Sequence, residues 1–61
     1  MDEIESRMAD ALQAEEEGDY RLAARLYNRL GRDIQARHGR FDARALSAFE
    51  GVARSIRKIT T

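Results

Sequence analysis

Four arginines have the spacing of a binding surface. Arg21, Arg25, Arg29 and Arg32 are three or four residues apart, so a helix would carry them on one face. A row of guanidinium groups can neutralise nucleic-acid phosphates and release their counterions. The chain as a whole has no net charge, however, and no aromatic side chain is interleaved with the row for stacking on bases. We therefore expect a solvated face that also meets acidic residues of the first helix, and a small dimeric nucleic-acid-binding regulator is the alternative function.

The other reactive side chains do not form a catalytic or metal site. Glu15, Glu16 and Glu17 are consecutive, so on a helix they point in different directions and are expected to form a solvated helix end. His38 stands before Gly39 at a predicted helix end, where capping is the expected role. None of the three serines has a base at a triad-like spacing, and the chain has no cysteine. We expect no enzyme activity, no metal and no cofactor.

Length and composition indicate the fold class and the number of domains. The chain has 61 residues, no proline, four glycines and 43 % hydrophobic residues, of which ten are alanine. Abundant alanine, arginine, glutamate and leucine favour helices, so the predicted fold class is all-α, in a single domain over residues 1–61. No apolar run has the length of a membrane span, and none follows a basic segment as in a signal peptide. We expect a cytoplasmic protein with no membrane partner.

Charge is divided along the chain. The first twenty residues hold eight acidic side chains and one basic one, whereas residues 21–61 hold ten basic and three acidic ones. An acidic first element would be attracted to basic later ones, either within one chain or between two copies.

Three helices are predicted, over residues 3–17, 20–37 and 43–59. Asp2, Asp19 and Asp42 each stand where an N-cap is expected. Gly18 fits the left-handed position that ends a helix, and the tight turn beside it predicts an antiparallel hairpin of the first two helices. Phe41 precedes the third N-cap, and Leu46 follows it by four residues, which is the pattern of a hydrophobic staple.

Apolar positions give each predicted helix a packing face. On the second helix they span about 200° of the surface, which is wide enough for two neighbours and predicts a central helix. Its apolar positions are Tyr20, Leu22, Ala23, Ala24, Leu26, Tyr27, Leu30 and Ile34. Those of the first helix are Ile4, Met8, Ala11 and Leu12. Those of the third are Ala45, Leu46, Ala48, Phe49, Val52, Ala53, Ile56 and Ile59, with Gly51 expected on the opposite, basic face.

A segment at the start of the second helix carries a family resemblance. Gly18-Asp19-Tyr20-x-x-Ala23-x-x-x-Tyr27 resembles the turn and second helix of a tetratricopeptide repeat, in which a small residue lets helices approach and an aromatic residue fills the space below it. With Ile34, Gly39, Leu46 and Val52-Ala53, residues 18–53 are similar to the kinesin-light-chain type of repeat found in many actinobacterial signalling proteins.

The match has departures and a competitor. Asp42-Ala43 stands where that repeat type usually has His-Pro, and residues 3–17 lack the Trp and Leu-Gly of an ordinary first helix. Three-helix microtubule-interacting-and-trafficking domains share the Gly-x-Tyr-x-x-Ala-x-x-x-Tyr segment. The arginine-rich and alanine-rich composition looks bacterial, which favours the tetratricopeptide resemblance.

The resemblance implies a tetratricopeptide-like helical hairpin plus a third helix, acting in protein–protein interaction. Such arrays need about three repeats to complete a core, more than this chain supplies. The outer helices are therefore candidates for binding a protein partner or a second copy, and a homodimer would complete the core most simply. Tyr20 and Tyr27 can also line a peptide groove, although core placement is favoured. The candidate binding residues are Ile4, Met8, Leu12, Tyr20, Arg21, Arg25, Arg29, Arg32, Val52, Ile56 and Ile59.

Overall fold

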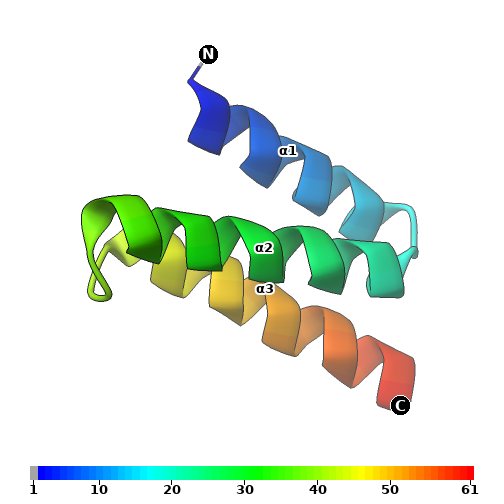
Figure 1. The fold of residues 1–61 in the computed structure, drawn as a ribbon. Coiled ribbons are helices and arrows are strands. Elements are labelled where there is room, and N and C mark those ends of the chain that lie inside the picture. Colours follow the sequence, from blue (N-terminus) through cyan, green and yellow to red (C-terminus); the bar gives the residue numbers. More distant parts are fainter. Residues whose placement is uncertain (1) are drawn as a thin grey trace.

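The computed structural model describes residues 2–61, which form three helices. They are α1 (Glu3–Glu16), α2 (Tyr20–His38) and α3 (Ala43–Thr60). Figure 1 shows α2 between the other two, and most contacts between helices join α2 to α3 while the fewest join α1 to α3. The all-α prediction is confirmed, each predicted helix is present with its ends within one residue, and α2 is central as expected.

Each helix begins at an aspartate whose carboxylate accepts a backbone hydrogen bond. The donors to Asp2, Asp19 and Asp42 are the N–H groups of Glu5 at 2.9 Å, Leu22 at 3.4 Å and Arg44 at 2.8 Å. Gly18 has a φ of 82°, which only glycine adopts without strain, and the chain reverses there into α2. The three predicted N-caps and the tight turn are confirmed.

The loop between α2 and α3 departs from the prediction. The pKa of Asp42 is lowered to about 2, because Arg44 donates hydrogen bonds to the charged carboxylate. The larger effect comes from the Arg44 side chain and the smaller one from its backbone N–H. Phe41 is 92 % exposed and Leu46 is 62 % exposed. The expected hydrophobic staple between them is therefore wrong: the aromatic ring lies in solvent rather than against the first turn of α3.

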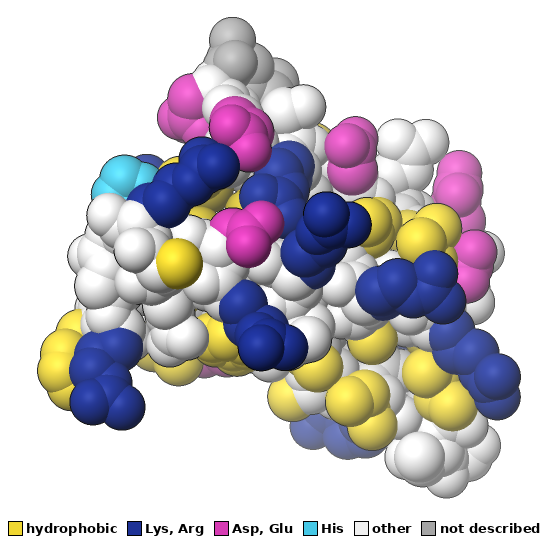
Figure 2. All heavy atoms as spheres, in the orientation of Figure 1, with side chains coloured by type: hydrophobic (Ala, Val, Ile, Leu, Met, Phe, Trp, Pro, Cys, Tyr) yellow, Lys and Arg dark blue, Asp and Glu magenta, His cyan; other side chains and the backbone are white. Residues whose placement is uncertain are grey.

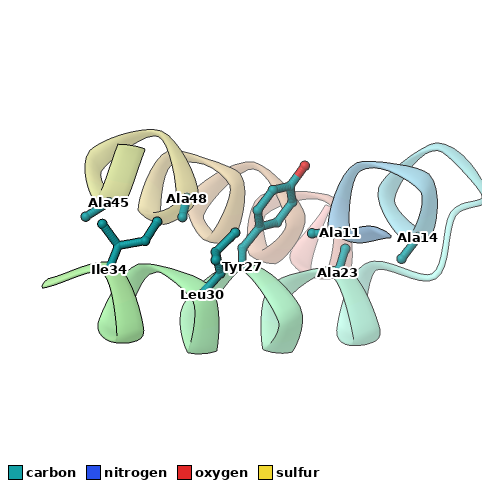
Figure 3. Close-up of a cluster of buried hydrophobic side chains, with 8 residues drawn as sticks. All are labelled: Ala11, Ala14, Ala23, Tyr27, Leu30, Ile34, Ala45 and Ala48. Carbon is teal, nitrogen blue, oxygen red and sulfur yellow. The ribbon is translucent and has the colours of Figure 1, made fainter. Parts of the chain in front are cut away.

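The core is built largely from alanine. Three large side chains of α2, those of Tyr27, Leu30 and Ile34, are buried and point toward the neighbouring helices in Figure 3. The other buried apolar residues that the structure describes are Ala11, Ala14, Ala23, Ala45 and Ala48. Because alanine projects so little from the helix, the helices lie close together around those three side chains, and little space is left for more.

Two glycines let α2 and α3 interlock. A Cβ at Gly51 would stand 2.7 Å from ring atoms of Tyr27, and one at Gly31 would stand 2.8 Å from the ring of Phe49. Each helix thus places an aromatic ring over a glycine of the other. The expectation that Gly51 lies on the exposed basic face is wrong, because the Tyr27 ring needs the space that a side chain there would fill.

This packing turns α3 away from the predicted orientation. Its buried positions are Ala45, Ala48, Gly51 and Ser55. Larger apolar residues that were expected beside them remain partly outside, with Ile56 48 % and Ile59 40 % exposed. The predicted apolar face is confirmed for Ala45, Ala48, Phe49 and Val52, which are buried or pack against the core. It is wrong for Leu46, Ile56 and Ile59, which remain exposed to one side.

Candidate interaction surface

A polar cluster of Glu15, Tyr27 and Arg54 joins the three helices. The Tyr27 hydroxyl donates to Glu15 Oε1 at 2.7 Å, and Arg54 donates to the same carboxylate through Nε at 3.0 Å and Nη2 at 3.2 Å. The Arg54 guanidinium carbon also lies 5.8 Å from the centre of the Tyr27 ring, within cation–π range. The expectation of a solvated Glu15 is therefore wrong, because its side chain is only 17 % exposed.

The cluster shifts the acidity of two of its members. The Arg54 hydrogen bond lowers the pKa of Glu15, since it stabilises the carboxylate. Burial, followed by the hydrogen bond to Glu15, raises the pKa of Tyr27 to about 12. The three side chains bond to one another, so the cluster holds the helices together, with the Arg54 side chain 45 % exposed at its edge.

A second set of ion pairs joins α1 to α2. Arg7 of α1 pairs with Asp33 of α2 at 2.9 Å, and Arg37 of α2 lies 3.5 Å from Glu3 of α1. Arg7 and Glu3 also pair within α1 at 3.7 Å. The acidic first helix therefore does lie against basic residues of the later helices. The bases involved are Arg37 of α2 and Arg54 of α3 rather than the row that the sequence singled out.

The arginine row, Arg21, Arg25, Arg29 and Arg32, is exposed along α2. Figure 2 shows basic side chains gathered across this helix, with acidic ones above them over α1. None of the four forms an ion pair with another of the residues 2–61. The expectation of a solvated basic face is confirmed. Its expected meeting with acids of the first helix is limited to Arg29, which lines a hollow together with Glu3 and Asp10.

The remaining candidate residues divide into two groups. Ile4, Met8 and Val52 are half-buried and pack against the core, and Tyr20 is half-buried at the start of α2. Leu12 is 46 % exposed on α1, and Ile56 and Ile59 lie similarly open on α3. Leu12 therefore lies on a different helix from Ile56 and Ile59, and α1 and α3 make the fewest contacts of the three helix pairs.

Several large apolar side chains of α3 are exposed or half-buried. We call this surface the α3 stripe; it consists of Leu46, Phe49, Val52, Ala53, Ile56 and Ile59. Near its N-terminal end is a hollow of about 170 Å³, which is lined by Gln35, Arg40, Phe41, Asp42, Leu46 and Phe49. Leu46, Phe49 and Phe41 are not among the candidate binding residues predicted from the sequence. The sequence could have indicated this surface, because α3 has more large apolar residues than one neighbouring helix can cover.

The described part of the chain shows neither a metal-binding cluster nor a membrane-spanning helix. Across residues 2–61, no group of three acidic, histidine or cysteine side chains is placed to hold a metal ion. No helix within that range combines the length and the apolar character needed to cross a bilayer. Comparisons with protein-family models, with curated proteins and with solved structures find no match for this chain.

Proposed function

We propose that this chain is a non-catalytic protein–protein interaction module, a tetratricopeptide-like adaptor or docking domain that also associates with itself. The observation that carries the proposal is the α3 stripe. Three of its large side chains, Leu46, Ile56 and Ile59, are between 40 % and 62 % exposed while alanine fills the core. A cluster of large apolar side chains on one helix face of so small a protein marks an interaction surface.

The helix arrangement supports the tetratricopeptide-like part of the proposal. Ala23 and Tyr27, the small and aromatic positions on which the resemblance rests, are both buried on α2. Three antiparallel helices correspond to one repeat and the first helix of a next one, so the outer face of α3 is where an array would continue. A cytoplasmic location in a bacterium fits the cysteine-free, arginine-rich and alanine-rich composition.

Capture of partners from a lysate of the source organism tests the proposal. Tagged wild-type protein should retain specific proteins, and Ile56→Glu should lose them because a charge would enter the α3 stripe. Ala36→Glu is the matched control, since it introduces the same charge at an exposed helical residue but lies on α2. Equal capture by all three proteins, or no capture and no self-association, would overturn the proposal.

The arginine row favours a second candidate, a small nucleic-acid-binding regulator. Four exposed guanidinium groups without ion-pair partners among residues 2–61 are available to phosphates. A gel shift with duplex DNA at low salt tests it, and a shift that disappears with Arg25→Glu/Arg29→Glu would support it. No shift at low salt would remove this candidate, since phosphate contacts are strongest there.

A further inference from the structure

We propose that two copies of this chain pair through an antiparallel contact of their α3 helices, with a twofold axis beside Ala53. The inference rests on the proposed function and names both the partner and the surface. In this pairing the α3 stripe of one copy covers the α3 stripe of the other.

The distribution of exposed apolar side chains selects α3 as its own partner. The outer face of α1 offers one large apolar residue, Leu12, and α2 offers Leu22, which is 36 % exposed. Neither can cover a stripe that runs from Leu46 to Ile59. Acidic α1 would complement the basic row of α2 in a head-to-tail contact, but the α3 stripe would then stay in water. Within a second copy, only another α3 presents a matching apolar row.

Charges beside the stripe select the antiparallel direction. Glu50 and Arg57 are exposed, lie seven residues apart on the same flank of the stripe, and form no ion pair with another described residue. A twofold axis perpendicular to the helices keeps the same flank together and reverses direction. Glu50 of one copy then stands opposite Arg57 of the other, and the contact occurs twice. In a parallel pair this flank would face the opposite flank, and the two charges would not meet.

The residue at the proposed axis is small. Ala53 is exposed and lies midway between Glu50 and Arg57 along α3. A methyl group at the crossing point lets two helices approach closely, as the alanines of the core already do within one chain. Large side chains on either side, Phe49 and Ile56, then lie across from those of the partner.

The hollow beside α3 provides a place for a partner side chain. It lies toward the N-terminal end of α3, where Leu46 and Phe49 line it. Reversal about Ala53 brings the C-terminal end of the partner helix, with its Ile59, opposite this end. The hollow measures about 170 Å³, and an apolar cavity of about 150 Å³ already accepts a benzene molecule. An isoleucine side chain therefore fits, and it fits twice in a symmetric pair.

Mass measurements on variants of the 61-residue chain test the pairing. Light scattering or sedimentation up to about 1 mM protein should show a dimer for the wild type and for Ala36→Glu, and a monomer for Ala53→Glu. Ala36 and Ala53 are both exposed helical alanines, so the two variants carry the same change at matched sites. Circular dichroism confirms that both remain helical.

A charge exchange tests the predicted contact itself. Glu50→Arg places like charges opposite each other twice and should weaken dimerisation roughly tenfold. Glu50→Arg/Arg57→Glu restores opposite charges in exchanged positions, so its dissociation constant should return to within about threefold of the wild type. A double variant as weak as the single one would overturn the contact.

A distance measurement tests the direction of the pair. The chain has no cysteine, so Ala43→Cys carries one spin label per copy at the exposed start of α3. With 1.5 Å of rise per residue and an axis beside Ala53, the two labels should lie about 30 Å apart. Parallel helices would bring them to about 10 Å.

The outcomes separate this inference from the proposed function. A dimer that Ala53→Glu leaves intact, or a short label distance, overturns the antiparallel α3 pair while self-association stands. A wild type that is monomeric throughout the concentration range overturns the pairing altogether. The proposed function is then decided by the lysate experiment with Ile56→Glu, whose partner would be a different protein.

Discussion

At the scale of single residues, Tyr27 makes two kinds of contact between helices, one through its ring and one through its hydroxyl. Its ring lies over Gly51 of α3, and its hydroxyl donates to Glu15 of α1. The side chain is 2 % exposed, so the phenol is removed from water and faces a carboxylate. Both effects oppose ionisation, because a buried phenolate beside a negative group has no compensating solvent.

The titration of Tyr27 should show this directly. The pKa of Tyr27 is raised to about 12 from the ordinary 10.0, so its contribution to stability is complete below pH 10 and is lost as pH rises toward 12. In a Tyr20→Phe variant, which keeps Tyr27 as the only tyrosine, phenolate absorbance should rise with a midpoint near pH 12. Urea-unfolded protein should titrate near pH 10, and the same midpoint in the folded protein would contradict the buried hydrogen bond.

Ser55 is a residue whose replacement should stabilise the protein. Its side chain is fully buried, and its hydroxyl has no hydrogen-bond partner among the described residues. Ser55→Ala removes an unpaired polar group and should raise the free energy of unfolding by about 1 kcal/mol in urea titrations. Exposed Ser47 on the same helix is the control, and Ser47→Ala should gain less than half as much. Equal gains would show that the Ser55 hydroxyl has a partner in solution.

At the scale of helices, the two aromatic–glycine contacts between α2 and α3 differ in how easily the ring can move away from an added side chain. The Tyr27 ring over Gly51 is buried and held by its hydrogen bond, whereas the Phe49 ring over Gly31 belongs to a half-buried side chain at the edge of the core. A new methyl group can push Phe49 outward, but it cannot displace Tyr27 without breaking the polar cluster.

Alanine substitutions at the two glycines should therefore have unequal effects. Gly51→Ala should destabilise the protein by about 1–3 kcal/mol, because overpacking exceeds the gain in helix propensity. Gly31→Ala gains the same propensity and should stay within about 1 kcal/mol of the wild type. Urea unfolding of the two variants compares them directly. A less stable Gly31→Ala would show that Phe49 is the more rigid contact.

The contacts between α2 and α3 also explain which features of the fold could be predicted from the sequence and which could not. Helix bounds, N-caps and the Gly18 turn depend on local chemistry, so they could be predicted within a residue. The orientation of α3 could not, because it depends on which ring finds which glycine across the interface. Hydrophobicity alone places Ile56 inside and Gly51 outside, and the fit of Tyr27 reverses both. The partnership of Glu15 with Arg54 joins residues 39 apart in the chain and has no local signal.

At the scale of the whole molecule, the three helices are joined unequally. Interlocked rings and glycines join α2 to α3. On α1 only Ala11 and Ala14 are buried, and the remaining attachment comes from half-buried Ile4 and Met8, from the Glu15 cluster and from partly exposed ion pairs such as Arg7 with Asp33. Surface ion pairs contribute about 0–1 kcal/mol each, so α1 is the part held most weakly. Because α1 is acidic and is attached partly by exposed ion pairs, added salt should weaken its packing against the other helices.

Hydrogen exchange should resolve this difference. Backbone amides of α1 should exchange before those of α2 and α3, since local opening of α1 leaves the interlocked pair in place. About 1 M salt should speed exchange in α1 and leave the other helices little changed, because salt screens exposed charges and not ring packing. Arg7→Gln should speed exchange in α1 at low salt and reduce the response to added salt. Equal exchange in all three helices, with or without salt, would mean instead that the chain opens as one cooperative unit.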